Sequence, residues 1–125
     1  MILSINHIQL VAEKDLVIKL RDFYCNIVGL TEGFRPAFER FGFWLYIKDK
    51  DVIHLITPKE GDDRSFQKSS FDHIAFKTAD YQGVLKKLKS LNVSFEEKPI
   101  PGMSDHQIFL RDPAGNRVEL NFDGD

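Results

Sequence analysis

The chain has 125 residues, 42% of them hydrophobic, and a formal net charge of −2. This length suits one domain with a packed core, and the charge gives no indication of binding to nucleic acid or to an anionic membrane. No apolar run approaches the roughly 20 residues of a membrane-spanning helix, and the N-terminus shows no signal peptide. The single cysteine, Cys25, cannot form an internal disulfide, so we expect a cytoplasmic protein.

The first part of the chain predicts one helix and four strands. The predicted strands cover residues 4–12, 33–40, 41–48 and 51–57. A helix follows the first strand, because apolar residues recur at helical spacing until Gly29, which fits the position after a helix end. The strand over 33–40 is the weakest, since Pro36 favours an edge or irregular structure. The order is β-α-β-β-β over residues 1–58.

The same order returns after a polar linker over residues 59–70. The predicted strands cover residues 71–78, 93–98, 105–111 and 116–122. Asp80 is expected to cap the helix between the first two strands, and Asn92 to close it in the left-handed conformation. A turn at Asp112-Pro113-Ala114-Gly115 joins the last two strands into a hairpin. The fold class is therefore α+β, with tandem βαβββ modules over 1–58 and 71–125 in one domain.

The two modules carry metal-capable residues at equivalent positions. Asn6-His7-Ile8-Gln9-Leu10 resembles Asp72-His73-Ile74-Ala75-Phe76, and the strand around His54 matches the strand around Glu119 at a nearly equal offset. Side chains alternate along a strand, so the polar residues lie on the face opposite the large apolar neighbours. These four residues are His7, His54, His73 and Glu119. Three imidazoles and a carboxylate suit Zn(II), Ni(II), Fe(II) or Mn(II). A lone strand histidine is usually structural, but four repeat-equivalent residues favour a shared metal site.

These motifs, together with the segment from Phe109 to Leu120, resemble the vicinal oxygen chelate superfamily of glyoxalases, bleomycin-resistance proteins and extradiol dioxygenases. The resemblance covers nearly the whole chain. It implies paired βαβββ modules whose curved mixed sheet surrounds a concave cavity, with helices outside and a divalent metal held at the positions of His7, His54, His73 and Glu119. In glyoxalase I-like members the position of His54 is typically a carboxylate or amide. His7, His73 and Glu119 also resemble the two-histidine, one-carboxylate triad of other members, and His54 would then be a fourth ligand or an acid/base.

Three functions remain open at this point. The first is an enzyme in which the metal polarises adjacent oxygens of a small substrate while Glu119 or His54 moves the proton. The second is a metal-free module that sequesters a small ligand, like bleomycin-resistance proteins, and the third is metal binding without turnover. The candidate pocket residues are Gln9, Phe43, Trp44, Gln107 and Phe109. The resemblance also implies a homodimer, with the cavity built within one chain or across two.

Overall fold

The computed structural model describes residues 1, 3–63 and 71–124. The chain divides into two compact units, Met1–Lys68 and Ser69–Asp125. Neither of the two described α-helices is long and apolar enough to cross a membrane. Within the described residues, each unit contains one four-stranded sheet and one α-helix, so the α+β class and the βαβββ order of each module are confirmed.

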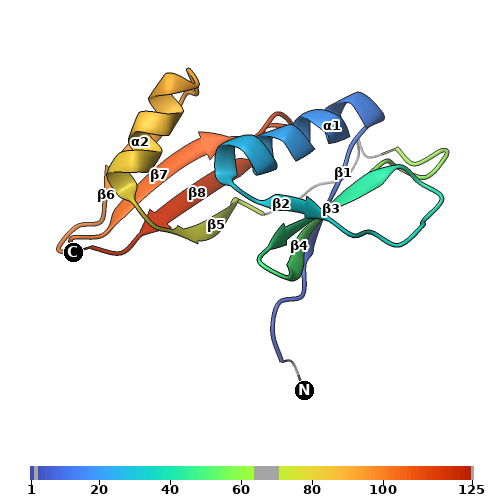
Figure 1. The fold of residues 1–125 in the computed structure, drawn as a ribbon, viewed down its shortest axis with the longest axis horizontal. Helices are drawn as coiled ribbons and strands as arrows, with labels where there is room; N and C mark the ends of the chain where they lie inside the picture. The colour runs from blue at the N-terminus through green and yellow to red at the C-terminus, as the bar shows by residue number, and fades with distance from the viewer. Residues whose placement is uncertain (2, 64–70, 125) are drawn as a thin grey trace. The chain divides into compact units, whose positions relative to one another are not determined.

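Unit 1 contains a mixed sheet with the strand order β1-β4-β3-β2 (Figure 1). Its elements are β1 (Ile8–Val11), α1 (Lys14–Phe23), the π-helical turn η1 (Tyr24–Val28), β2 (Thr31–Gly33), β3 (Gly42–Ile47) and β4 (Lys50–Ile56). Strand β1 is parallel to β4, and the other two pairs are antiparallel. The parallel pair is possible because α1 forms the crossover between the first strand and the rest of the sheet.

Helix α1 covers one face of this sheet. Its side chains Val17 and Leu20 are fully buried, as are Leu45, Ile53 and Leu55 of the strands that α1 contacts. Burying one such aliphatic side chain contributes about 1.5–3 kcal/mol, so this layer supplies much of the unit's stability. Because neighbours in a strand point to opposite faces, the residues between these core positions face away from α1.

The helical segment ends where the sequence predicted. Gly29 has φ 109°, and its N–H and that of Leu30 both donate to the carbonyl oxygen of Tyr24. A left-handed residue at this place is easiest for glycine, which has no Cβ to collide with the turn.

Unit 2 repeats the arrangement with the strand order β5-β8-β7-β6. Its elements are β5 (His73–Thr78), α2 (Tyr81–Ser90), β6 (Glu96–Pro99), β7 (His106–Arg111) and β8 (Arg117–Phe122). The Asp80 side chain caps α2 by accepting from the Gly83 N–H at 3.1 Å, and Asn92 has φ 56°, as expected. Pairing is also equivalent, since His54 lies beside Gln9 and Glu119 lies beside Ala75.

The predicted hairpin between β7 and β8 is present, and Asp112 organises its turn. The Asp112 Oδ1 accepts from the N–H groups of Ala114 and Asn116, each at 2.9 Å. Gly115 takes the left-handed conformation with φ 88°. These bonds fix the register of β8 against β7, and with it the position of Glu119 in the strand.

The prediction of a strand over residues 33–40 was wrong. Strand β2 ends at Gly33, and residues 34–41 form a loop before β3. Pro36 has no N–H to donate to a ladder, and Arg40 donates through Nη1 to the Thr57 carbonyl instead of extending the sheet. We call residues 34–41 the β2–β3 loop below.

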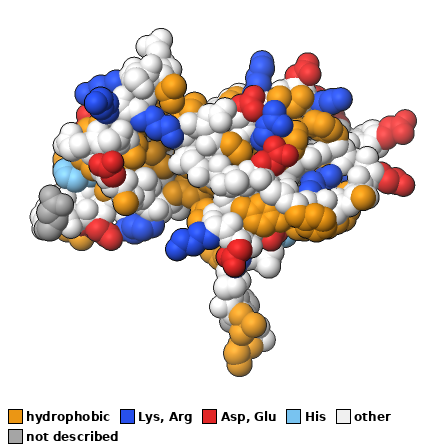
Figure 2. Space-filling model, viewed as in Figure 1, with side chains coloured by type: hydrophobic (Ala, Val, Ile, Leu, Met, Phe, Trp, Pro, Cys, Tyr) orange, Lys and Arg blue, Asp and Glu red, His pale blue; other side chains and the backbone are white. Residues whose placement is uncertain are grey.

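The first strand is also shorter than predicted, because β1 begins at Ile8 rather than at residue 4. The described residues before it lie outside the sheet of unit 1. Figure 1 shows this arm projecting, and Figure 2 shows hydrophobic side chains at its end. Met1, Leu3 and Ile5 are all exposed. His7 therefore lies just outside the strand, next to its first residue.

Candidate metal and substrate site

His73 and Glu119 form a close pair in unit 2. His73 is the first residue of β5, and Glu119 lies in the middle of the neighbouring strand β8. The His73 Nε2 lies 3.2 Å from the Glu119 Oε1, although Glu119 is only 5% exposed. A carboxylate buried to this degree requires hydrogen-bond donors or a cation.

Both side chains of this pair make further hydrogen bonds through their other polar atoms. The His73 Nδ1 donates to the Asp72 Oδ2 at 2.6 Å, and Asp72 also accepts from Arg117 at 3.2 Å. These contacts, led by the hydrogen bond from His73, hold the pKa of Asp72 below its usual range. The Glu119 Oε2 accepts from the side-chain amides of Gln107 at 3.3 Å and Asn121 at 3.0 Å. The imidazole and the carboxylate are therefore fixed in orientation by outer contacts.

This pattern leaves two electron-pair donors facing each other. When His73 is neutral and its Nδ1–H donates to Asp72, the lone pair of the ring is on Nε2. That lone pair faces the Glu119 Oε1, which is also an acceptor. Two acceptors at 3.2 Å repel unless a positive charge lies between them, and a proton on Nε2 or a metal ion supplies it. The chemistry of this donor pair fits a divalent cation.

The predicted pocket residues Gln107 and Phe109 lie beside this pair. Gln107 donates to Glu119, as described above. The Phe109 ring meets the His73 ring edge-on, with centroids 5.8 Å apart, and the Arg117 guanidinium lies 3.9 Å from the centroid of the same ring. Phe109 thus forms an apolar wall next to the histidine.

His7 and His54 form the corresponding pair in unit 1, but by ring stacking. Their ring centroids are 3.7 Å apart, and the Trp44 indole stacks on His54 with centroids at 4.1 Å. His54 is consequently 8% exposed, while His7 is exposed. Trp44 faces His54 because the two residues are cross-strand partners in β3 and β4.

Both histidines of unit 1 are oriented by a neighbouring oxygen. The His54 Nε2 donates to the Asp51 Oδ2 at 2.6 Å, and the His7 Nδ1 donates to the Asn6 Oδ1 at 2.8 Å. The available lone pair is therefore on Nδ1 of His54 and on Nε2 of His7. Burial lowers the pKa of His54, and the hydrogen bond from His54 lowers that of Asp51.

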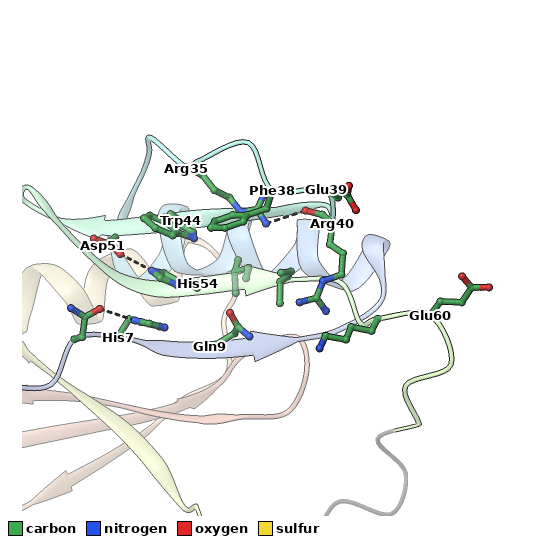
Figure 3. A pocket seen from close by; sticks show the side chains of 14 residues that line it. His7, Gln9, Arg35, Phe38, Glu39, Arg40, Trp44, Asp51, His54 and Glu60 are labelled. Carbon is green, nitrogen blue, oxygen red and sulfur yellow. Dashed lines mark hydrogen bonds and ion pairs between the residues drawn. The ribbon is translucent and has the colours of Figure 1, made fainter.

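A pocket of about 820 Å³ opens beside these histidines (Figure 3). Gln9 and Trp44, both predicted, line it together with His7 and His54. Figure 3 shows Asp51, Trp44 and the two histidines at one end and Arg40 and Glu60 at the other. The volume falls within the roughly 300–1,000 Å³ of small-molecule sites.

Phe43 lies outside this pocket, and several residues that line it were not among the candidates from the sequence. Phe43 faces α1, where the Arg21 guanidinium lies 4.5 Å from its ring centroid. Phe43 and Trp44 are adjacent in β3 and must point to opposite faces. The residues not predicted include Arg35, Phe38, Arg40, Asp51 and Lys59. The signal for three of them was a proline-interrupted segment with two arginines, which is more typical of a binding loop than of a strand.

Each unit thus contributes one pair of the predicted metal ligands. Within either unit, the described residues form no group of three or more histidine, cysteine or acidic side chains suited to a metal ion. A common centre for His7, His54, His73 and Glu119 stays a prediction. His106, the remaining histidine, stacks on Tyr81 with ring centroids 4.2 Å apart.

A model of the glyoxalase/bleomycin resistance protein/dioxygenase superfamily matches residues 4–120. The chain belongs to this superfamily. Solved structures of similar fold include a glyoxalase family protein from Bacillus anthracis, with 22% identity, a TM-score of 0.77, and coverage of 98% of this chain and 97% of that chain. Membership confirms the resemblance seen in the motifs around His7, His73 and Glu119.

Two further relatives have assigned activities. A variant of the fosfomycin resistance protein FosX from Listeria monocytogenes, solved with Mn(II), shares 21% identity over 98% of this chain and 94% of that chain, with a TM-score of 0.74. Lactoylglutathione lyase from Agrobacterium tumefaciens shares 18% identity over 95% of this chain and 92% of that chain, with a TM-score of 0.67. The comparison with curated proteins found no significant match. Divalent metals and small substrates therefore occur within the superfamily, and these likenesses establish the fold.

Because burial lowers the pKa of His54, we expect the free energy of unfolding to decrease in mild acid. The folded-state pKa of His54 lies below the ordinary 6.5, so its contribution is present above pH 6.5 and is lost as the pH falls toward the lowered value. We expect the metal-free protein to lose stability from pH 7.5 to 5.5, by at most about 1.4 kcal/mol per pH unit from this residue. Urea unfolding at both pH values checks this. The His54→Gln variant should lose less stability over this pH range, and an equal loss of stability in both proteins would contradict the prediction.

Proposed function

We propose that this protein is a divalent-metal-dependent enzyme acting on a small substrate with two adjacent oxygen atoms. The proposed ligands are His7, His73 and Glu119, and His54 serves as a fourth ligand or as an acid/base. The observation that supports this most strongly is the contact between the His73 Nε2 and the buried Glu119 Oε1 at 3.2 Å, which brings an imidazole nitrogen and a carboxylate oxygen together. The two pairs would share one ion, either within one chain or across a homodimer in the cytoplasm.

The outer contacts suit a metal site. Metal-binding histidines commonly donate their second N–H to a carboxylate or carbonyl, which fixes the tautomer and orients the ring. Asn6 does this for His7 and Asp72 does it for His73, through the same ring nitrogen and from the preceding residue in each repeat. Two imidazoles and a carboxylate leave Zn(II), Ni(II), Fe(II) and Mn(II) as candidates.

When bound, the metal would polarise the adjacent oxygens of the substrate as a Lewis acid. The chain's own contribution to proton transfer is the pair of His54 and Asp51. Asp51 accepts from the His54 Nε2, so it holds the imidazole in one tautomer and would stabilise it when the other nitrogen takes up a proton. The Trp44 indole keeps this ring in place and excludes water from one of its faces.

A second candidate is binding without turnover. The observation in its favour is that the pocket of unit 1 has an aromatic wall and a small-molecule volume without any contribution from Glu119. A metal-free protein of this kind would hold a ligand against Trp44 and Phe38. Metal content separates this function from the proposed enzyme, and a turnover assay separates the enzyme from a metal-binding protein without turnover.

The decisive experiment measures metal in protein purified without chelators or an affinity tag. We expect about one divalent ion per site, and His54→Ala then assigns the role of His54. If His54 is a ligand, metal content falls. If it only transfers protons, metal stays and turnover of an active substrate falls by roughly 100- to 10,000-fold. Unchanged metal content after single alanine substitutions of all four proposed ligands would refute the metal site.

A further inference from the structure

The pocket of unit 1 has a cationic end that the proposed chemistry does not use. Arg35 and Arg40 of the β2–β3 loop and Lys59 after β4 all line it. Among the residues that the structure describes, none of these three forms an ion pair with a carboxylate. Figure 3 shows Arg40 at the end of the pocket away from His7 and His54.

Arg35 is the least satisfied of these cations. Its Nη2 donates to the Arg40 carbonyl at 3.0 Å, but its Nε is buried and is the one such side-chain atom in the described ranges without a hydrogen-bond partner. Burial first, and then the charge of Arg40, lower the pKa of Arg35. A partly buried guanidinium without a carboxylate partner among the described residues costs free energy, which an anion in the pocket would offset.

The loop nevertheless holds this guanidinium in a defined place. Its Cζ lies 5.1 Å from the centroid of the Phe38 ring, a cation–π distance. Gly42 leaves room beside it, because a Cβ there would approach the Arg35 Nη2 to 3.2 Å and would collide with the Leu55 carbonyl. The cation is thus positioned before any ligand arrives, which lowers the entropic cost of binding.

The acidic residues of the pocket do not neutralise this end. Asp51 is engaged by His54 at the opposite end. Glu39 and Glu60 are exposed, and Figure 3 shows the Glu60 carboxylate pointing away from the pocket. Arg40 is anchored through Nη1 to the Thr57 carbonyl at 3.2 Å, a contact that leaves its charge unpaired among the described residues.

We infer that the cationic end of this pocket binds an oxyanionic group of the substrate, a carboxylate or a phosphoryl-type group, through Arg35 and Arg40. This inference rests on the proposed function only for the orientation of the substrate. The anion would lie at the arginine end, and the two adjacent oxygens would lie at the end with His7 and His54. Bidentate guanidinium contacts suit both kinds of anion.

The first test uses metal-free protein and three simple probes: benzoate, phenylphosphonate and the neutral benzyl alcohol. Binding is followed by NMR titration, including the side-chain Nε–H signal of Arg35, which Arg35→Lys identifies by its loss. We expect at least one anion to bind at least about tenfold more tightly than benzyl alcohol and to shift that signal. The tighter anion identifies the substrate's charged group, and its affinity should fall with added salt.

Variants locate the site. Arg35→Gln and Arg40→Gln should each weaken the anion about tenfold or more and leave benzyl alcohol unchanged. Arg111→Gln changes an exposed arginine of unit 2 whose side chain donates to the Gly115 carbonyl, and this matched control should have no effect. Circular dichroism confirms the fold of each variant, and Arg40→Gln keeps the test valid if Arg35→Gln does not fold.

The second test uses metal-loaded protein with catechol and 3,4-dihydroxybenzoate, which share adjacent oxygens and differ by one carboxylate. The carboxylate should improve affinity about tenfold in the wild type and not in Arg35→Gln or Arg40→Gln. Anion affinities within twofold of the wild type in both variants would overturn the inference. Failure of the proposed function appears separately, as protein that retains no metal, and leaves the metal-free titration unaffected.

Discussion

Glu119→Gln should weaken divalent-metal binding by at least about 100-fold. Loss of an outer contact of a metal ligand costs about 10- to 100-fold, and removal of the charged ligand itself should cost more. Glu119 is the one carboxylate among the four proposed ligands, and it is 5% exposed, so no solvent screens the lost charge. Competition titration with a metal-sensitive dye gives the dissociation constants of both proteins.

The same substitution should leave the metal-free fold intact. The new amide oxygen can accept from Gln107 and Asn121, as the Glu119 Oε2 does. The new amide nitrogen can donate to the His73 Nε2, which replaces a contact between two acceptors by a hydrogen bond. The thermal midpoint of the metal-free variant should therefore not fall. Glu96→Gln, an exposed change in the same unit, is the control. A metal affinity within threefold of the wild type would remove Glu119 from the site.

Asp72→Ala should weaken metal binding about 10- to 100-fold although Asp72 is not a proposed ligand. Its Oδ2 fixes the His73 Nδ1 hydrogen, and without it the imidazole can rotate and exchange tautomers. Asp72→Asn should retain nearly full affinity, because Asn6 performs the same task for His7 in the first repeat. Dissociation constants of the three proteins test this order.

The control for Asp72 is Asp123→Ala. Asp123 is an exposed carboxylate of the same unit, paired with Lys77 at 2.7 Å, and its loss should not change metal affinity. If Asp72→Asn binds metal as weakly as Asp72→Ala, the negative charge of Asp72 and not its hydrogen bond supports metal binding. If neither variant differs from the wild type, Asp72 does not position His73.

The sequence alone determined the repeated fold and the four candidate ligands. Alternation along β4 and β8 places His54 and Glu119 opposite the apolar core, and equivalent offsets relate them to His7 and His73. The turn at Asp112 and Gly115 and the end of the first helical segment at Gly29 were also predicted from the sequence. These features follow from local backbone geometry, which a few consecutive residues fix.

Only the tertiary structure decided the lining of the pocket and the available nitrogen of each histidine. The β2–β3 loop is held by bonds to residues distant in sequence, such as Tyr46 to the Phe34 carbonyl at 2.5 Å and Arg40 to the Thr57 carbonyl. A proline-interrupted segment has no periodicity that would predict those bonds. The choice between Nδ1 and Nε2 likewise depends on whether Asn6, Asp51 or Asp72 reaches one ring nitrogen, which is set by side-chain packing in three dimensions rather than by the order of residues.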